Sequence, residues 1–190
     1  SVSAQNQRDK WEMLPLVKGG YATSIVKLGN DYYVGAGSHI FKSDDGLNSF
    51  KRIATLPESS GVGVQFYLTN TGRVLARPQT NFGGLYEISS SSSLISLMPD
   101  SLSGKIYALT VSDSIVFIIM AKGLIKTSLN FEKFEILSSS SSGENLYWLG
   151  FEAIIHNPIK NQLIVRNYST GFYTFDLNAK SWQSLSALND

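Results

Sequence analysis

The sequence contains no cysteine, and this excludes thiol catalysis and cysteine-bound zinc from its chemistry. Neither sign of charge is in excess, since 16 basic and 15 acidic residues leave a formal net charge of +1. A chain so close to neutral is not expected to have a polyanion as its main partner, so we expect no nucleic-acid binding. The two histidines, His39 and His156, are far apart and lack metal-ligand spacing.

Long hydrophobic runs are also absent. The most apolar stretch, residues 115–121, is far shorter than the roughly 20 residues that a membrane-spanning helix needs. We therefore expect no membrane span, and the stretch is typical of a strand that is buried on both faces. No convincing amphipathic helix is present. Even so, 43% of the residues are hydrophobic and 12% are aromatic, which suffices for the core of one domain.

What the chain does contain is an internal repeat. A pair of apolar residues recurs four times at intervals of about 40–50 residues, which is the period of blades built from strands. The four pairs are Ile40-Phe41, Leu85-Tyr86, Leu124-Ile125 and Phe172-Tyr173. Each pair is followed by a turn and then by another strand-like segment, which mostly opens with an aromatic residue. These segments begin at Phe50, Leu94, Phe134 and Trp182.

Alternating polarity and β-branched residues predict four strands in each repeat. In the first two repeats the predicted strands cover residues 22–28, 31–36, 39–43, 49–55, 64–69, 73–77, 84–88 and 94–98. In the last two they cover residues 105–111, 114–120, 123–127, 133–137, 149–155, 162–167, 171–176 and 181–185. Turn residues such as Gly29-Asn30 and Ser112-Asp113 separate them.

This pattern predicts an all-β fold, a β-propeller of four-stranded antiparallel blades with four blades in the chain. A single propeller domain is expected over residues 11–190. Its repeats lie at roughly 21–56, 63–98, 105–137 and 147–185.

Residues 11–15, Trp-Glu-Met-Leu-Pro, resemble the fourth strands of the repeats and predict an extra outer strand. Two arrangements stay open at this point. The blades could close a small ring of four, or the chain could be part of a larger propeller. In the second case the exposed sheet edge would invite association with a second chain.

Residues 43–50, Ser-Asp-Asp-Gly-Leu-Asn-Ser-Phe, resemble the Asp-box of the sialidase-type (BNR) β-propellers. That pattern reads Ser/Thr-x-Asp-x-Gly-x-x-Trp/Phe, and Leu47 here replaces its Gly. The residues that carry the resemblance are Ser43, Asp45, Ser49 and Phe50. It implies a structural turn, in which the Ser43 hydroxyl and the Asp45 carboxylate accept hydrogen bonds from turn N–H groups. Phe50 would pack beneath that turn.

The resemblance does not extend to the sialidase active site. Sialidases clamp a carboxylate with three arginines and use a Tyr/Glu nucleophile pair and an Asp acid. The chain has five arginines spread over its length, and Arg52-Ile53-Ala54 breaks the Arg-Ile-Pro motif of that family. No nucleophile elbow, phosphate loop or dinucleotide fingerprint is present. We therefore predict a protein that is not an enzyme and that needs no metal or cofactor.

A binding role is favoured instead, because propellers use the loops of one face for recognition. The loops after the second strands and between blades carry aromatic and amide side chains, which suit contact with protein or sugar. The candidate binding residues are Arg77, Asn81, Phe82, Trp148, Asn167 and Tyr168. We predict a non-catalytic interaction module that binds a protein or peptide partner. The alternatives are a carbohydrate-binding, lectin-like propeller and a degenerate glycoside-active enzyme domain.

Two low-complexity features complete the sequence. The serine runs 89–93 and 138–142 predict mobile connections, because such polar tracts bury little surface. Residues 1–10 are expected to be a flexible N-terminus, and the small residues at positions 1–4 resemble the remnant of a signal peptide. An extracellular or periplasmic location follows as an expectation. A tag remnant or an ordinary flexible terminus is an equal alternative.

Overall fold

The computed structural model describes residues 22–57, 63–79, 84–102, 104–139 and 150–185. Over these ranges the chain forms four antiparallel sheets of four strands each, and it contains almost no helix. Each sheet is built from four consecutive strands, so every sheet is one sequence repeat. The predicted all-β propeller architecture with four blades is thus confirmed. One short 3-10 turn, η1 (Asp100–Leu102), precedes the third blade and was not predicted.

The strands lie close to their predicted positions, with ends shifted by at most two residues. The first blade contains β1 (Ala22–Leu28), β2 (Asp31–Ala36), β3 (His39–Ser43) and β4 (Lys51–Thr55). The second blade contains β5 (Val64–Leu68), β6 (Val74–Pro78), β7 (Tyr86–Ile88) and β8 (Leu94–Ser96).

The other two blades follow the same plan. The third blade contains β9 (Ile106–Ser112), β10 (Ile115–Met120), β11 (Gly123–Ser128) and β12 (Phe134–Ser139). The fourth blade contains β13 (Phe151–Asn157), β14 (Gln162–Asn167), β15 (Gly171–Asp176) and β16 (Ser181–Ser184).

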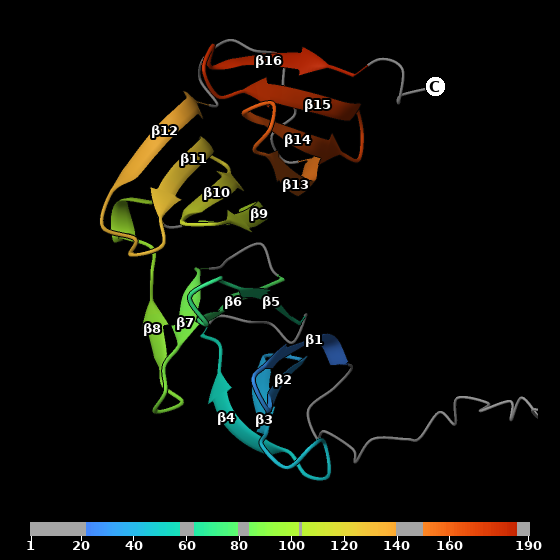
Figure 1. Cartoon of the computed structure of the whole chain (residues 1–190), viewed down its shortest axis with the longest axis vertical. Coiled ribbons are helices and arrows are strands. Elements are labelled where there is room, and N and C mark those ends of the chain that lie inside the picture. Colours follow the sequence, from blue (N-terminus) through green and yellow to red (C-terminus); the bar gives the residue numbers. More distant parts are fainter. Residues whose placement is uncertain (1–21, 58–62, 80–83, 103, 140–149, 186–190) are drawn as a thin grey trace, which may run out of the picture.

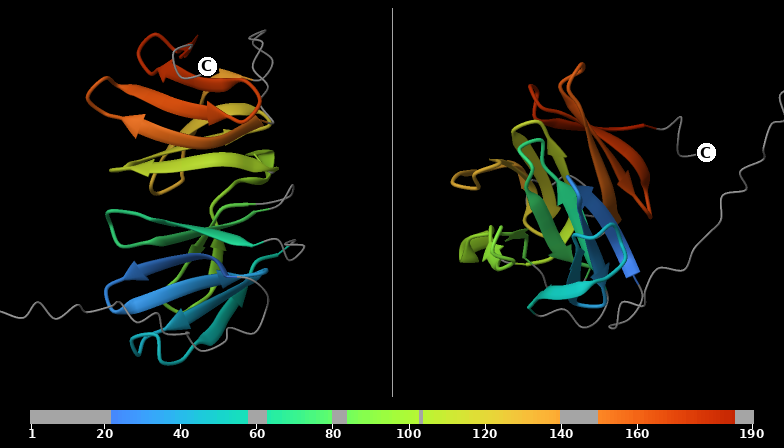
Figure 2. Two further views of the ribbon diagram at one scale, coloured as in Figure 1. Left: turned by 90° about the vertical axis from the view of Figure 1, so that its right-hand side faces the viewer. Right: turned by 60° about the horizontal axis from the view of Figure 1, so that its bottom comes forward.

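The four blades fan out along an open arc (Figure 1). The first strand of each blade lies on the inside, where β1 packs beside β5, β5 beside β9, and β9 beside β13. The fourth strands lie on the outside. Figure 2 shows the first and last blades at opposite ends of the molecule, so the described part of the chain is a segment of a ring and not a closed ring of four. The predicted outer strand at residues 11–15 lies outside the described residues.

Hairpin turns between the first and second strands follow from residues that tolerate left-handed backbone. Gly29, Gly72, Asp113 and Asn161 have φ of 60°, 76°, 49° and 47°, one in each blade. Glycine, Asn and Asp adopt this conformation most readily, which is why these turns were visible in the sequence. The β2–β3, β10–β11 and β14–β15 connections are short, so these antiparallel neighbours pair in sequence order.

The hydrophobic core consists of layers between successive blades. Tyr33, Ile40, Phe66 and Ala76 belong to the layer between the first and second blades. Leu75, Leu85, Ile118 and Phe131 belong to the layer between the second and third. Phe117, Phe151, Val165 and Phe175 belong to the layer between the third and fourth. Each interior blade is therefore buried on both faces.

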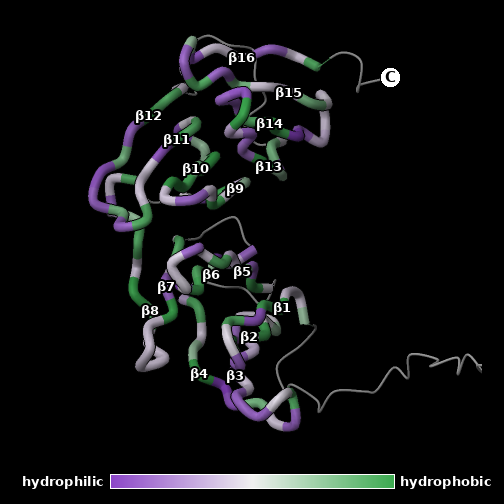
Figure 3. Tube along the Cα trace, viewed as in Figure 1, coloured by the Kyte–Doolittle hydropathy of each residue, from purple (hydrophilic) through white to green (hydrophobic). Residues whose placement is uncertain are grey.

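Strand β10 shows why the longest apolar run of the sequence exists. Its side chains alternate between two core layers, with Ile118 in one and Phe117 in the other. A strand that is covered on both faces needs apolar residues at every position. Figure 3 shows β10 as largely hydrophobic, whereas the hairpin turns are mostly hydrophilic. Among the described residues, no helix is long and apolar enough to cross a bilayer.

The turn at residues 43–50 is held by side-chain hydrogen bonds. Ser43 Oγ accepts from the N–H of Leu47 (3.0 Å) and donates to Asp45 Oδ1 (2.7 Å). Asp45 Oδ1 also accepts from the N–H of Ser49 (3.0 Å), and Oδ2 accepts from the Ser49 hydroxyl (2.6 Å). The hydrogen bonds from Ser49 and then Ser43 hold the pKa of Asp45 at about 2, below its ordinary 3.8. Phe50 packs against the cluster that contains Phe41.

Candidate functional site

A pocket of about 250 Å³ lies on the face predicted for binding, where first strands begin and second strands end. Three blades border it. Its lining residues are Arg77 and Gln79 at the end of β6, Lys105, Ile106 and Tyr107 at the start of β9, Phe151 and Glu152 at the start of β13, and Tyr168 after β14. The antiparallel order of each blade brings these segments, far apart in the sequence, to one end of the inner strands.

Arg77 joins the second and third blades at this pocket. Its Nε donates to the Tyr67 hydroxyl (2.9 Å), its Nη2 to Gln65 Oε1 (2.6 Å), and its Nη1 to the carbonyl of Ile106 on β9 (2.7 Å). Burial raises the pKa of Tyr67, and the positive charge of Arg77 partly opposes this. The guanidinium of Arg77 is therefore fixed in place, and it contributes a rigid positive wall to the pocket.

The rest of the pocket combines aromatic rings with charges of both signs. Phe151 and Tyr107 are almost fully buried, and burial raises the pKa of Tyr107. Lys105 Nζ lies 5.2 Å from the centre of the Tyr107 ring. At the rim, Glu152 forms an ion pair with Arg166 at 2.9 Å, and both side chains are partly exposed. A polar or charged partner could therefore meet complementary groups around an apolar floor.

Two of the predicted binding residues, Arg77 and Tyr168, border this one pocket although about 90 residues separate them in the sequence. Tyr168 is 61% exposed, which is unusual for such a large side chain. Three other predicted residues, Asn81, Phe82 and Trp148, lie outside the described part of the chain. Their role in binding stays a prediction.

Asn167, the sixth predicted residue, is placed differently. It is buried, and its Oδ1 accepts hydrogen bonds from the N–H groups of Ser169 (3.0 Å) and Thr170 (3.2 Å). Such bonds are typical of an Asx turn. Asn167 thereby shapes the loop that presents Tyr168, and its amide oxygen is directed to the backbone of its own loop.

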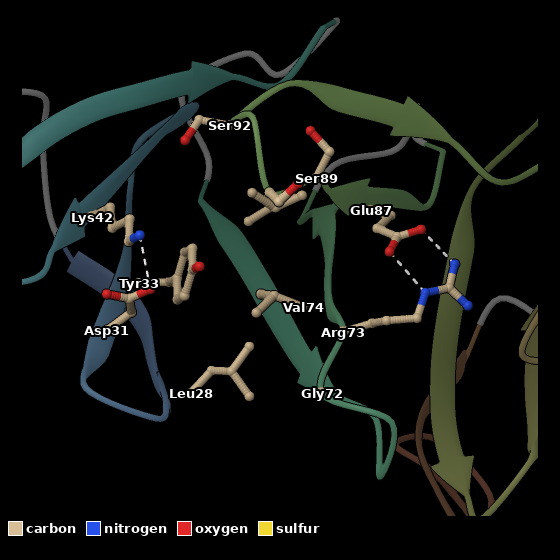
Figure 4. A pocket seen from close by; sticks show the side chains of 12 residues that line it. Leu28, Asp31, Tyr33, Lys42, Gly72, Arg73, Val74, Glu87, Ser89 and Ser92 are labelled. Atoms are coloured by element: carbon tan, nitrogen blue, oxygen red, sulfur yellow. Dashed lines mark hydrogen bonds and ion pairs between the residues drawn. The ribbon is translucent and has the colours of Figure 1, made fainter.

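A second hollow, of about 440 Å³, lies between the first and second blades on the opposite face (Figure 4). We call it the polar groove. The residues that line it are Leu28, Asp31, Tyr33, Lys42, Gly72, Arg73, Val74, Glu87, Ile88, Ser89, Ser90 and Ser92. The sequence interpretation did not include this groove, because it considered only the loops of the other face.

The charged residues of the polar groove form two ion pairs. Lys42 Nζ lies 2.8 Å from Asp31 Oδ2, and this hydrogen bond raises the pKa of Lys42. Arg73 Nε donates to Glu87 Oε1 at 2.8 Å, and the bonds to Glu87 raise the pKa of Arg73. Tyr33 lies beside the first pair, with Lys42 Nζ 5.9 Å from the centre of its ring, and burial raises the pKa of its hydroxyl. The Arg73 guanidinium is directed away from Tyr33, to the Leu129 carbonyl of the third blade.

No constellation of catalytic type stands out among the residues described. Within the described ranges, no group of three or more His, Cys, Asp or Glu residues could hold a metal ion. His156 Nδ1 lies 2.7 Å from Ser112 Oγ and its ring lies against Phe117, so burial lowers the pKa of His156. His39 Nδ1 lies 2.9 Å from the Thr55 hydroxyl. Nδ1 of each histidine thus has a hydroxyl partner within the fold, His39 inside the first blade and His156 across from the fourth blade to the third.

Comparison with known proteins supports the fold and leaves the function open. No family model and no curated protein sequence matches the chain. The computationally designed protein Ika4 is 13% identical, with a TM-score of 0.59 over 88% of this chain and 99% of that chain. The extracellular domain of the putative hybrid two-component system BT4673 from B. thetaiotaomicron is 14% identical, with a TM-score of 0.63 over 87% of this chain.

The Niastella koreensis GH74 enzyme is also similar, with 12% identity and a TM-score of 0.63 over 93% of this chain. The chain spans 21% of the BT4673 structure and 31% of the GH74 enzyme. At this low identity the likeness concerns the arrangement of blades alone. The class that fold and comparisons define is the β-propeller.

Proposed function

We propose that this chain is a non-catalytic interaction module that binds a protein or peptide through the face bordered by Arg77 and Tyr168. The observation that carries the proposal is the pocket shared by three blades, with its aromatic floor and its rim of mixed charge. Propeller folds host many functions, so the argument depends on this site and not on the fold.

The size and chemistry of the pocket favour a macromolecular partner over a buried small molecule. At about 250 Å³ it is smaller than the roughly 300–1,000 Å³ of typical small-molecule sites. It is large enough for one or two anchoring side chains of a partner, and anchors of this kind dominate interface energies. The exposed ring of Tyr168 would extend the contact, because tyrosine offers a large rigid area at low entropic cost.

The non-catalytic part of the proposal is supported by the state of the charged groups. Arg77 already donates to three partners, and Glu152 is paired with Arg166. Glu152 is the one carboxylate among the described residues that line this pocket, whereas glycoside cleavage commonly uses a pair of carboxylates. A degenerate glycoside-active domain is the alternative, and a similar propeller, the GH74 enzyme, is named as an enzyme.

We also propose that the chain belongs to the Asp-box propellers and acts outside the cytoplasm. The hydrogen-bonded turn at Ser43, Asp45 and Ser49 supports the first point. The similarity to the extracellular domain of BT4673 supports the second.

The test is selection of peptides from a random phage-displayed library on the immobilised chain. Selected peptides should bind wild type and lose about tenfold or more in affinity on Tyr168→Ala or Lys105→Ala, which corresponds to about 1.4 kcal/mol or more. Tyr32→Ala, a tyrosine of the first blade, is the matched control and should leave binding unchanged. Failure to enrich any peptide, or peptides that ignore both pocket substitutions, would contradict the proposal.

A glycan array run beside the selection addresses the lectin alternative. Saccharide binding that is lost on Tyr168→Ala would favour a carbohydrate-binding role for this face.

A further inference from the structure

The polar groove exists because one turn of the second blade lacks large side chains. In the third and fourth blades, the turn between the third and fourth strands caps the layer shared with the preceding blade. In the third blade Leu129 and Phe131 fill that place, and in the fourth blade Leu177 packs there. In the second blade the same turn is the serine run 89–93. Serine side chains are too small to fill the space, so a groove of about 440 Å³ stays open.

The serine turn is an ordered wall of this groove. The N–H of Ser89 donates to the carbonyl of Ser93 (2.9 Å), and the N–H of Ser92 donates to that of Ser89 (2.9 Å). The hydroxyls of Ser89 and Ser93 lie 2.7 Å apart, and Ser91 Oγ lies 2.9 Å from Ser89 Oγ. Ser90 and Ser92 line the groove. Residues 89–93, for which a mobile connection was predicted, thus form a hydrogen-bonded turn between β7 and β8.

The groove is polar but carries no excess charge. Asp31 offsets Lys42 in the groove, and the Arg73–Glu87 pair, whose guanidinium is directed to the Leu129 carbonyl of the third blade, is neutral as well. A charged ligand would gain no net attraction from such a site and would have to compete with the existing pairs. An apolar ligand would remove water from the hydroxyls and the ion pairs and would offer no hydrogen bonds in its place, which costs free energy. A neutral ligand that is rich in hydroxyl groups avoids both costs.

The lining also contains the apolar surface that a sugar ring needs. Figure 4 shows Tyr33, Val74 and Leu28 facing the space between the two blades, with the Lys42–Asp31 pair and the serines beside them and the Arg73–Glu87 pair turned away from it. The C–H face of a sugar can pack on this surface while its hydroxyls bond to carboxylate, ammonium and serine groups at the edge. The volume lies within the roughly 300–1,000 Å³ of small-ligand sites.

We propose that the polar groove is a binding site for a neutral saccharide. The site lies on the face opposite the proposed peptide pocket and shares no residue with it. It is therefore independent of the proposed function, and either site can fail its test without affecting the other.

The test uses an array of neutral oligosaccharides, followed by titration calorimetry with the saccharides that bind. Ser90→Trp places a bulky ring in the groove and should weaken binding about tenfold or more, a change of about 1.4 kcal/mol. Ser91→Trp is the matched control, since Ser91 belongs to the same turn but does not line the groove. It should retain wild-type affinity.

Tyr33→Phe gives a second measurement that does not depend on filling the groove. It removes one hydroxyl from the lining and keeps the ring, so the fold should melt as before while saccharide affinity falls several-fold. Peptide binding at the other face should be unchanged in all three variants. The proposal is overturned if no neutral oligosaccharide binds above background, or if Ser90→Trp and Tyr33→Phe both bind as tightly as wild type.

Discussion

Single side chains determine the geometry of the turn between β3 and β4. Asp45 accepts three hydrogen bonds within this turn, two of them from Ser49. Leu47 has a φ of 76° and follows Gly46 at 74°, so two consecutive residues adopt left-handed backbone. For leucine this conformation is unfavourable, and it occurs where the Asp-box pattern has glycine. The turn thus contains both a stabilising carboxylate and a strained residue.

The protonation of Asp45 should affect the stability of the fold at low pH. Its pKa is about 2 in the folded chain and 3.8 ordinarily, so its contribution is complete above the higher value and disappears as the pH falls towards 2. We expect Asp45→Asn to melt at a lower temperature than wild type near neutral pH. The difference should shrink across this acidic range. Melting followed by circular dichroism measures it, with Asp44→Asn as the control, and a difference that is independent of pH would contradict the expectation.

The strain at Leu47 should be relieved by glycine. We expect Leu47→Gly to raise the free energy of unfolding by about 0.5–1 kcal/mol. Glycine removes the strain of a leucine in left-handed backbone, and this gain exceeds the loss from the greater conformational entropy of glycine in the unfolded chain. Gly46→Ala is the reverse change at the neighbouring position, because it adds a Cβ to a residue with left-handed backbone. A Cβ at Gly46 would meet no atom within 4 Å, so its expected loss of about 1 kcal/mol is purely conformational. Chemical denaturation of both variants is the measurement, and shifts of the same sign would refute the strain argument.

At the scale of elements, the blades are joined by side chains that reach from one sheet to the next. Thr23 Oγ1 donates to the carbonyl of Val64 and accepts from its N–H, both at 2.9 Å, which ties β1 to β5. Gly35 allows β2 to approach the same strand, since a Cβ there would lie 2.6 Å from the Val64 Cβ. Arg77 links β6 to β9 through its hydrogen bond to the Ile106 carbonyl.

Removal of the Arg77 guanidinium should therefore loosen the contact between the second and third blades. We expect Arg77→Met to lower the free energy of unfolding by about 1.5–3 kcal/mol, because hydrogen bonds to charged groups contribute that much and the Ile106 carbonyl loses its donor. Arg166→Met is the control. Arg166 is 56% exposed in its ion pair with Glu152, so its loss should cost about 1 kcal/mol or less. Equal losses in urea denaturation would show that Arg77 does not link the blades.

At the scale of the whole molecule, the interior blades have a neighbour on both sides and the blades at the ends of the arc have one. On the fourth blade, Ile155 points away from the core layer that contains Ile154, and it is 63% exposed. On the first blade, Ile25 points away from the second blade and is 53% exposed. Exposed aliphatic residues on the innermost strands are unusual in a propeller, where the next blade would cover them.

We expect these end faces to associate, with the fourth blade of one copy against the first blade of another. This contact would continue the packing that already joins blade to blade within the chain. Analytical ultracentrifugation should show mass that increases with concentration, and Ile155→Lys should shift the equilibrium towards monomer. Ile136→Lys is the control, because Ile136 is 51% exposed on the outer strand β12, away from both end faces. A wild-type protein that stays monomeric at high concentration would contradict this expectation.

The sequence by itself determined the local elements of this protein. Apolar pairs, alternating polarity and turn residues such as Gly29 and Asp113 are properties of short segments, so they located the strands of all four blades to within two residues. They also indicated the turn at residues 43–50, because its hydrogen bonds join residues close in sequence. The loops alone also predicted Arg77 and Tyr168, which border one pocket and whose role in binding stays a prediction.

Only the tertiary structure decided what depends on contacts between distant segments. The pocket that brings Arg77 near Tyr168 requires three blades to pack, and the polar groove requires the serine turn of one blade to face Tyr33 of another. The hydrogen bonds of the serine turn were not predicted from the sequence, because they join hydroxyl groups that meet only in the folded turn. The open arc is likewise a tertiary property, since the angle between blades depends on how their facing side chains pack, and no local pattern encodes that angle.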